Sequence, residues 1–554
     1  MGDTEAPQAQ GASSAAGWWR SAAIYQIYPR SFADGNGDGI GDLAGVRAHL
    51  TYLADLGVDA VWFNPWYASP MADAGYDVAS YREIDPIFGT LAEAEILIRE
   101  AHDLGIRIIV DIVPNHTSDA NPWFKEALEA GPGAAVRDLF WFRPGLGEHG
   151  QLPPNNWSSI FGGPAWTRTK NPDGTDGEWY LHLFAPGQPD FNWESPKVRE
   201  EFEDVLRFWF DRGADGVRID SAALLIKDPT LADFDADNPP DPHPFEDRDE
   251  VHEVYRSWRR IAESYPEPRA LIGEVWLPSE PDRFALYLRP DELHTSFNFD
   301  FLGCPWDAAA MRKVIDDGIA LHAPVKAPAT WVLSNHDVIR HVTRYGREDT
   351  RFSLDYRQFD AYSDLELGTR RARAAALLLL ALPGSAYIYQ GEELGLYEVL
   401  DIPEDMRQDP MFFQTNGVNL GRDGCRVPIP WSGEEPPFGF SPDGSPGAPW
   451  LPQPADWSNY TVAHEQGDPS SMLELYRSAL HLRRDTPGLG DGPLTWLPSE
   501  PNVLTFARGD GFAACVNLSE AAIDLPGGSE VILASGPLDG GRLGVDTAVW
   551  LRTA

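Results

Sequence analysis

Eight short apolar runs alternate along the chain with longer amphipathic stretches. The runs are rich in Val, Ile, Tyr, Phe and Trp and are too short for helices, so they predict strands at 22–29, 59–65, 106–114, 215–220, 270–276, 295–301, 330–335 and 385–391. Helical patterns separate them, each ending at a glycine, for example at 43–57, 91–105 and 369–384. Strand and helix that alternate eight times predict an α/β fold of the (β/α)8, or TIM, barrel type.

Two connections between predicted strands are too long for simple loops. Residues 117–185 follow the third strand and predict an inserted subdomain, and residues 392–465 follow the eighth strand and predict a second insertion. Because barrel active sites form at the carboxyl ends of the strands, we expect both insertions to wall the pocket. The expected division is a disordered tail, a barrel in two pieces and a C-terminal antiparallel β domain, over 1–17, 18–116 with 186–485, and 486–554.

The charge and cysteine content narrow the classes of partner and location. The 44 Lys and Arg against 85 Asp and Glu give a net charge of −41, which disfavours nucleic acid and anionic membranes. The longest apolar run, 374–382, is too short to span a bilayer, and residues 1–17 lack the pattern of a secretion signal. Three cysteines without metal-type spacing favour a reducing, cytoplasmic location.

An arginine and an aspartate share one face of the fourth predicted strand. The strand period of two places Arg218 and Asp220 together and turns Val217 and Ile219 the other way. Inside a barrel such charges are costly unless they are paired or functional. Arg218 favours the ionised form of Asp220, which a nucleophilic carboxylate requires. A buried structural ion pair is the alternative interpretation of this pattern.

Acidic and histidine side chains stand at the ends of three more predicted strands. Glu274 ends the fifth strand among apolar neighbours, which suits a general acid, although a solvent-exposed strand end is the alternative. His336 and Asp337 follow the seventh strand, and Asp111 and His116 close the third. Four strands that end this way at one barrel face predict an active site, and two carboxylates are the minimum for glycoside hydrolysis.

The segment DGNGDGIGD at 34–42 carries oxygen ligands at alternate positions. The side chains of Asp34, Asn36, Asp38 and Asp42, with the carbonyl of Ile40, suit a hard cation such as calcium. The segment lacks the bidentate glutamate of an EF-hand loop. A metal-free turn with helix-capping aspartates is the alternative.

Taken together, the motifs resemble glycoside hydrolase family 13, the α-amylase family. Its four signature regions are matched in order by DIVPNH (111–116), GVRID (216–220), GEVW (273–276) and SNHD (334–337). Further segments are similar to bacterial α-glucosidases and oligo-1,6-glucosidases, namely GYD (75–77), NNWSSIFGGPAW (155–166), QPDFNW (188–193), YQGEELG (389–395) and GRDGCRVPIPW (421–431).

The resemblance implies a retaining mechanism and assigns its residues. Asp220 would be the nucleophile, Glu274 the acid that protonates the leaving oxygen and then activates water, and Asp337 the carboxylate that holds the sugar hydroxyls in the transition state. The calcium-type loop is shared with the family, and no organic cofactor is implied.

The resemblance also implies a pocket closed around one terminal glucose. Asp77 and Arg426 match a pair that binds the non-reducing glucose and closes the pocket of exo-acting glucosidases. The remaining matches line the terminal-sugar subsite or stack near the ring, and they are Tyr76, His116, Phe161, Phe184, Arg218 and His336. The expected activity is an exo-acting α-glucosidase on maltose, short α-1,4-oligosaccharides or other α-glucosides.

The residues after Asp220 favour α-1,4 over α-1,6 linkages. In this family a valine directly after the nucleophile accompanies α-1,6 cleavage, whereas Ser221 followed by Ala222 is similar to the maltase type. Phe191 stands where the QPDLNW version of the motif has leucine. The expected partner is a small α-glucoside or oligosaccharide, bound by a monomer or a homo-oligomer.

Two other functions stay open at this point. One is a glucosyl-transferring or isomerising relative of trehalose synthase, sucrose isomerase or amylosucrase type, because the acceptor side of the pocket decides whether water or a sugar reaches the intermediate. The other is a non-catalytic binding barrel, which the three retained carboxylates disfavour.

Overall fold

Eight parallel strands form the central sheet of the protein. The computed structural model describes residues 15–235, 238–277, 281–354, 356–538 and 540–553. In it the strands are ordered β11-β10-β9-β5-β2-β1-β13-β12. Their bounds are β1 (Ala23–Ile27), β2 (Ala60–Phe63), β5 (Arg107–Ile112), β9 (Gly216–Ile219), β10 (Ala270–Gly273), β11 (Thr295–Ser296), β12 (Thr330–Val332) and β13 (Ser385–Tyr389). The Asn298 N–H donates to the Thr330 carbonyl at 2.9 Å and joins the two ends, so the predicted TIM barrel is confirmed.

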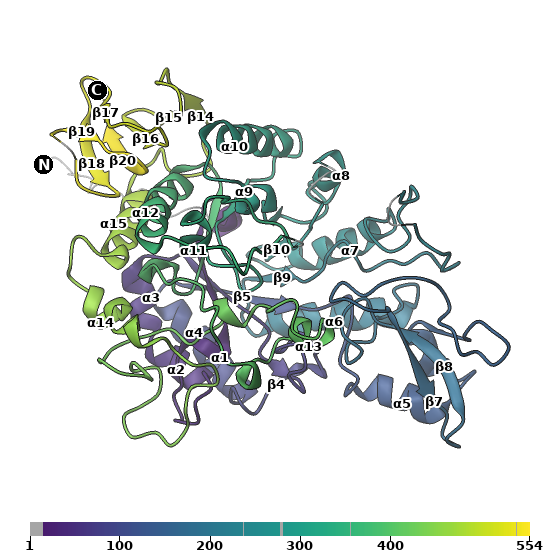
Figure 1. The fold of residues 1–554 in the computed structure, drawn as a ribbon. Coiled ribbons are helices and arrows are strands. Elements are labelled where there is room, and N and C mark those ends of the chain that lie inside the picture. Colours follow the sequence, from purple (N-terminus) through teal and green to yellow (C-terminus); the bar gives the residue numbers. More distant parts are fainter. Residues whose placement is uncertain (1–14, 236–237, 278–280, 355, 539, 554) are drawn as a thin grey trace, which may run out of the picture.

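Helices follow the strands and cover the outside of the barrel (Figure 1). α4 shows why they form where they do, since Thr90 and Glu93 make a capping box at its start and Ala94, Leu97 and Ile98 lie on its buried face. The principal barrel helices are α2 (Leu43–Ala48), α3 (Leu50–Leu56), α4 (Leu91–Asp103), α6 (Pro196–Asp211), α7 (Val251–Glu263), α8 (Pro281–Leu286), α10 (Ala308–His322), α12 (Leu365–Ala381) and α15 (Met472–Asp485). No helix in the described ranges is both long enough and apolar enough to cross a membrane.

One predicted strand was wrong in its length, and most of the predicted tail is not described. The strand expected at 295–301 is only two residues long, because the Asn298 side chain accepts from the Phe301 N–H and starts helix α9 (Phe299–Gly303) inside it. The tail expected over 1–17 lies outside the described residues up to residue 14, and the 3-10 helix η1 (Ala15–Arg20) begins directly after it.

The strand period of two separates an outer and an inner apolar layer. Tyr25, Ile27 and Val61 belong to a large cluster shared with the helices, whereas Ile24 and Trp62 belong to a separate cluster of inward-facing residues. Trp18 and Trp19 of η1 join this inner cluster. The inward positions that remain at the carboxyl ends of the strands are therefore free for polar side chains.

The two insertions and the C-terminal region carry structure of their own. After β5 come α5 (Pro122–Ala130), η2 (Ala135–Leu139) and a three-stranded sheet of β6 (Phe142–Arg143), β8 (Asp176–Leu181) and β7 (Trp166–Lys170). After β13 come η3 (Glu392–Leu394), η4 (Glu404–Met406), α13 (Pro410–Gln414), η5 (Asp423–Cys425), η6 (Ala455–Tyr460) and α14 (Val462–Glu465).

A five-stranded antiparallel sheet ends the chain, as predicted. Its order is β14 (Leu494–Trp496), β15 (Val503–Arg508), β16 (Phe512–Asn517), β20 (Thr547–Arg552) and β18 (Glu530–Ala534). It packs on α12, where the Trp550 indole donates to the Leu377 carbonyl at 2.9 Å. The shorter elements are α1 (Pro29–Phe32), β3 (Tyr67–Ala68), β4 (Ser80–Ile84), α11 (His341–Tyr345), β17 (Ile523–Asp524) and β19 (Arg542–Leu543). The exact limits of the predicted domains stay a prediction.

Candidate active site

Arg218 is the centre of a first polar cluster at the carboxyl ends of β5, β9 and β10. It lies inside the barrel and is 2% exposed. Its guanidinium contacts Asp220 at 2.7 Å, Glu274 at 2.8 Å and Asp111 at 3.0 Å. Parallel pairing explains the convergence, because Arg218 stands opposite Asp111 on β5 and Ile272 on β10, two residues before Glu274.

Ser221 fixes how the two candidate catalytic carboxylates lie. Its hydroxyl donates to Asp220 Oδ2 at 2.9 Å, and its N–H donates to Glu274 Oε2, also at 2.9 Å. The N–H points that way because Ser221 has a φ of 48°, an uncommon conformation for a residue other than glycine. One strained residue therefore binds both carboxylates.

The environment of Glu274 suits a proton donor. Burial, helped by the negative charges of Asp220 and Asp337, raises its pKa to about 8 against the opposing effect of Arg218. Asp111 resembles Glu274 in this respect, because burial raises its pKa to about 7. Only Glu274 is open to a ligand, since its side chain is 21% exposed and that of Asp111 is 0% exposed.

Asp337 belongs to a second cluster built on two arginines. Its Oδ1 accepts from Arg422 at 3.1 Å and from Arg426 at 3.0 Å, and its Oδ2 lies 3.2 Å from His336 Nε2. Burial would raise the pKa of Asp337, but His336 and the two arginines outweigh burial and hold it well below its usual range. His336 is itself buried, which lowers its pKa well below 6.5 and favours its neutral form. The positive charge that keeps Asp337 ionised therefore comes from the two arginines.

Arg422 joins this cluster to the segment after β2. It binds Asp73 and Asp409, each at 2.6 Å, in addition to Asp337. Its guanidinium also lies 5.0 Å from the centre of the Phe161 ring. Arg422 thus connects both insertions with the ends of strands β2 and β12.

The structure places Asp77 and Arg426, the two residues predicted to bind the non-reducing glucose, in different surroundings. Asp77 is fully buried, and its carboxylate accepts from two backbone N–H groups at 2.9 Å each. Arg426 pairs with Asp337 at 3.0 Å. The ion pair that joins the two segments is Asp73 with Arg422, each four positions towards the N-terminus, and the sequence analysis missed it because residue 73 lies outside the matched motif GYD. The role of Asp77 and Arg426 in binding glucose stays a prediction.

The other predicted binding residues lie around the two clusters. The Tyr76 hydroxyl donates to Asp111 at 3.0 Å, and its ring stacks on His336 at 5.3 Å between centres and 7° between planes. Phe184 lies 4.8 Å from the His116 ring and 5.3 Å from the Phe161 ring, and both phenylalanines come from the first insertion. Tyr76 therefore bridges the clusters, and the phenylalanines form an aromatic side.

A buried lysine in this region escaped the sequence analysis. The Lys227 ammonium donates to Asn115 Oδ1 at 2.5 Å and to the Leu224 carbonyl at 2.8 Å, and it pairs with Asp190 at 2.7 Å. It joins the loops after β5 and β9 to the end of the first insertion. The only signal in the sequence is a lysine at the end of an apolar run, which by itself indicates no role.

The loop at 34–42 buries two of its predicted ligands, whereas Asn36 and Asp38 are exposed. Asp34 and Asp42 are buried; Asp34 accepts from the Gly39 N–H at 2.8 Å, and Asp42 caps α2 through Gly45 at 2.7 Å. Burial raises the pKa of Asp42, and the charges of Asp34 and Asp38 add to this, which is the electrostatics that a cation would relieve. Among the described residues no group of three or more His, Cys, Asp or Glu side chains could hold a metal ion by itself. Calcium would thus depend on Asn36 and the Ile40 carbonyl, and it stays a prediction.

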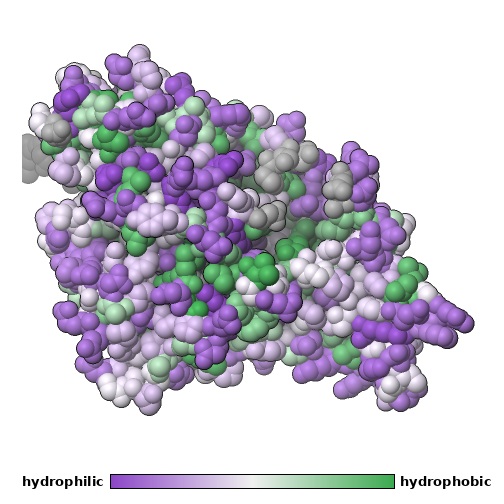
Figure 2. Space-filling model, in the orientation of Figure 1, coloured by the Kyte–Doolittle hydropathy of each residue, from purple (hydrophilic) through white to green (hydrophobic). Residues whose placement is uncertain are grey.

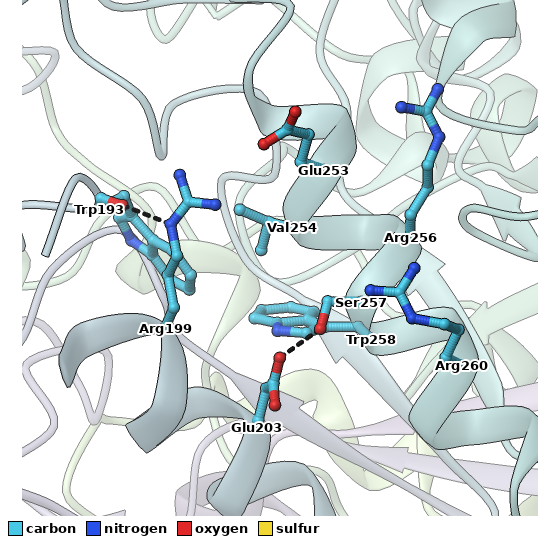
Figure 3. A pocket seen from close by; sticks show the side chains of 9 residues that line it. All are labelled: Trp193, Arg199, Glu203, Glu253, Val254, Arg256, Ser257, Trp258 and Arg260. Carbon is cyan, nitrogen blue, oxygen red and sulfur yellow. Dashed lines mark hydrogen bonds between the residues drawn. The ribbon is translucent and has the colours of Figure 1, made fainter. Parts of the chain in front are cut away.

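A cavity of about 490 Å³ lies elsewhere, on the outer surface between α6 and α7 (Figure 3). Arg199 donates to the Trp193 carbonyl at one side of it, and Ser257 donates to Glu203 at another. It is lined by residues of α6 and α7 and by Trp193, which precedes α6, and by none of the predicted site residues. The chemistry therefore belongs to the strand ends, not to this cavity.

Comparison with known proteins agrees with a site for glycoside chemistry at the carboxyl ends of the barrel strands. Residues 26–492 match the alpha-amylase catalytic domain. The chain belongs to the α-amylase family, glycoside hydrolase family 13. It is a glycoside hydrolase of the α-glucosidase-like group.

Individual relatives align with most of this chain. A probable alpha-glucosidase of Rhizobium meliloti is 38% identical over 89% of this chain and 87% of its own length. An oligo-1,6-glucosidase of Parageobacillus thermoglucosidasius is 35% identical over 84% of each. The crystal structure of XgtA, an alpha-glucosyl transfer enzyme, matches with a TM-score of 0.82 and 35% identity, over 97% of this chain and 99% of that one.

Proposed function

We propose that this glycoside hydrolase is a retaining, exo-acting α-glucosidase that releases glucose from maltose, short α-1,4-oligosaccharides or other α-glucosides. The observation that carries the proposal is the Arg218 guanidinium, which holds Asp220 and Glu274 at 2.7 and 2.8 Å. Two carboxyl groups on one guanidinium lie close together, as retaining enzymes require with their separation of about 5 Å.

The first step forms a covalent glucosyl-enzyme. Glu274, protonated at neutral pH because burial raises its pKa to about 8, gives its proton to the glycosidic oxygen. An oxygen of Asp220 attacks C1 of the glucose as the bond from C1 to the leaving oxygen breaks. Arg218 and Ser221 keep the attacking carboxylate in place.

The second step releases glucose with the original anomeric configuration. Glu274, now ionised, takes a proton from water, and the water oxygen attacks C1 as the bond to Asp220 breaks. Positive charge develops on the sugar in both transition states. The ionised Asp337, kept charged by Arg422 and Arg426, stabilises it.

The exo-action in the proposal rests on Arg422. Its ion pairs with Asp73 and Asp337, and its position over Phe161, occupy the region behind the terminal glucose. A sugar chain that continued beyond this glucose would have to displace a buried ion pair, which is costly.

Glucosyl transfer is the second candidate function. The likeness to XgtA, a named transfer enzyme, supports it, and the same intermediate serves both reactions. The likeness to an oligo-1,6-glucosidase favours cleavage of α-1,6 linkages, whereas the residues from Ser221 to Ala223 favour α-1,4 linkages.

An NMR time course with maltose, isomaltose, sucrose and trehalose tests the proposal. We expect α-glucose as the first product, faster turnover of maltose than of isomaltose, and no product longer than the substrate at low concentration. β-Glucose as the first product would contradict the double displacement, and a dominant transfer or isomerised product would favour the second candidate.

We also propose that the loop at 34–42 binds calcium. The negative charges of Asp34 and Asp38, which act on the carboxyl group of Asp42, support this, with Asn36 and the Ile40 carbonyl as neutral ligands. Excess chelator should lower the melting temperature by several degrees, since a ligand bound only to the folded state stabilises it. Calcium added without magnesium should restore the melting temperature. In an Asp38→Asn variant, chelator should lower the melting temperature by less. Equal melting temperatures with and without chelator would favour a metal-free turn.

A cytoplasmic location completes the proposal. All three cysteines, Cys304, Cys425 and Cys515, are free and buried, as is usual in a reducing compartment. Fractionation of the producing cells tests it, with activity expected in the cytosolic fraction.

A further inference from the structure

The turn that follows β9 fixes the two candidate catalytic carboxylates from behind. It consists of Ser221, Ala222 and Ala223. Ser221 donates to Asp220 through its hydroxyl and to Glu274 through its N–H, and it does so at a φ of 48°. A residue other than glycine keeps such a conformation only where its surroundings fix it. Whatever holds this turn therefore also holds both carboxylates.

The backbone of Ala222 is tied on both sides. Its N–H donates to the Glu274 carbonyl at 2.9 Å and joins the end of β9 to the end of β10. Its carbonyl accepts from the Tyr255 hydroxyl, which comes from α7. Within the described ranges this carbonyl meets no other donor, and Ala222 is 0% exposed. One hydroxyl group thus satisfies a buried carbonyl next to Ser221.

Tyr255 is built into the core as a fixed donor. It lies on the buried face of α7, and its ring packs against Trp258 and Tyr287 with centres 5.7 and 5.9 Å apart. Burial, helped by the charge of Glu292, raises the pKa of Tyr255 well above its usual range, so the hydroxyl keeps its proton. The hydrogen bond to Ala222 therefore persists at every pH at which the enzyme is active.

The helix and the site lie on opposite sides of this turn. α7 covers the barrel from outside (Figure 1), whereas Figure 2 shows a hollow in the middle of the molecule, near the place where Figure 1 labels β9 and β10. The hydroxyl of Tyr255 contacts the backbone of Ala222 and neither of the two carboxylates. Its influence on the site has to pass through the turn.

We propose that Tyr255 is a positioning residue, which holds the turn after β9 and, through Ser221, aligns Asp220 with Glu274. The inference rests on the proposed function, in which these two carboxyl groups are the nucleophile and the acid. The route runs from the Tyr255 hydroxyl to the Ala222 carbonyl, along one residue of backbone to Ser221, and from there through two hydrogen bonds.

Removing the hydroxyl has a defined consequence for Glu274. Tyr255→Phe keeps the ring but leaves the buried Ala222 carbonyl without a donor, which is costly. The peptide group between Ala222 and Ala223 then turns towards another donor, and Ser221 relaxes from its uncommon conformation. Because the Ser221 N–H lowers the pKa of Glu274, weakening that bond raises the pKa of Glu274.

Steady-state kinetics of Tyr255→Phe test the proposal. We expect kcat on maltose to fall about fivefold, with KM changed by less than about twofold because the cluster around Asp337 is intact. The basic limb of kcat/KM should move to a pH higher by about 0.3 unit. p-Nitrophenyl α-glucoside should lose less activity than maltose, because its leaving group needs less help from an acid.

Tyr180→Phe is the matched control. Tyr180 is also buried, and its hydroxyl donates to the Pro186 carbonyl at 2.7 Å inside the first insertion. Its loss should change kcat by less than about twofold and leave the basic limb in place. Equal losses in the two variants, or an unshifted limb in Tyr255→Phe, would overturn the role of Tyr255.

A double-mutant cycle tests the route through Ser221. Glycine adopts a positive φ without strain, so Ser221→Gly keeps the N–H and removes the tendency to relax, at a lower starting rate because the bond to Asp220 is lost. In this background Tyr255→Phe should lower kcat by less than about twofold. The same fivefold loss in both backgrounds would show that Tyr255 does not act through Ser221.

An NMR titration of the Glu274 carboxyl group separates this inference from the proposed function, because it needs no turnover. A raised pKa in Tyr255→Phe, in a protein that hydrolyses no α-glucoside, would keep Tyr255 as the residue that positions this pair and remove the proposed function. Turnover of maltose by the unchanged protein, together with an unshifted titration in Tyr255→Phe, would keep the proposed function and remove the role of Tyr255.

Discussion

Two neighbouring clusters of arginines and carboxyl groups differ in their number of arginines. The first has one arginine, Arg218, for three carboxyl groups, and the second has two, Arg422 and Arg426, for another three. Both are almost completely buried, so the cost of removing charge from water is similar in each. The balance of charge therefore decides how each cluster holds protons.

The outcome differs between the two clusters. Around Arg218, burial prevails and raises the pKa of Asp111 to about 7 and of Glu274 to about 8. Around the arginine pair, burial is outweighed at two carboxyl groups, so the pKa of Asp337 lies well below its usual range and that of Asp409 falls to about 2. At Asp73 burial still prevails and raises the pKa to about 6. Glu274 can therefore exchange a proton near neutral pH, whereas Asp337 keeps its negative charge.

The largest expected effect comes from the nucleophile of the first cluster. Asp220→Asn should lower kcat on p-nitrophenyl α-glucoside by about 10⁴-fold or more, because no covalent intermediate can form. Asp111→Asn is the matched control, since Asp111 shares Arg218 but is 0% exposed and cannot reach a substrate. Comparable losses in both variants would show that Arg218, not the nucleophile, sets the rate.

The charged carboxylate of the second cluster should have the next largest effect. Asp337→Asn keeps the shape but removes the charge that stabilises the transition state, so we expect kcat to fall by about 10³-fold. Asp409→Asn removes a carboxylate that also binds Arg422 but is buried away from the site. In the same assay we expect this variant to lower kcat less than tenfold. The reverse order would contradict the assigned roles.

Replacing the forked arginine should have a smaller effect. Arg422→Lys keeps one positive charge but cannot bind Asp73, Asp337 and Asp409 together, so kcat/KM for maltose should fall by about 10²-fold. The relative activity on maltohexaose should rise, because the ion pair behind the terminal glucose is loosened. A fall without this change in chain-length preference would count against Arg422 as the group that enforces exo-action.

The smallest expected effect is on the pH dependence of kcat/KM, which couples the two clusters. Activity requires protonated Glu274, so kcat/KM should fall as pH rises through its pKa of about 8. Asp337 contributes to that raised pKa, so the residual activity of Asp337→Asn should lose its basic limb at a pH lower by about half a unit. An unshifted limb would mean that the clusters titrate independently.

The same pKa shift predicts how stability depends on pH. A carboxyl group whose pKa rises on folding from 4.5 to about 8 stabilises the protein fully below 4.5 and loses this contribution as pH rises towards 8. Glu274→Gln should therefore flatten the decrease of the free energy of unfolding over this range, as measured by denaturant titration.

Much of the fold and of the site could be predicted from the chain alone. Seven of the eight predicted strands have the expected place, and the one predicted at 295–301 is cut short by the helix that Asn298 caps. The period of two also placed Arg218 and Asp220 on one face correctly. These features are local, because periodicity and capping act between residues a few positions apart.

Contacts between distant segments escaped that reasoning. The pairing of Asp73 with Arg422 joins residues 349 positions apart, and the bond from Lys227 to Asn115 joins residues 112 apart. The matched motifs pointed to Asp77 and Arg426, and only the tertiary structure showed that Asp73 and Arg422 form the ion pair between the two segments.

The sequence by itself determined which elements form and which chemical groups reach the end of each strand, because hydrophobic period and local capping are written into neighbouring residues. The tertiary structure alone decided how many arginines each carboxyl group meets. That number, together with the burial of each carboxyl group, sets the pKa values, because electrostatic interactions act through space between groups that the barrel and its insertions bring together.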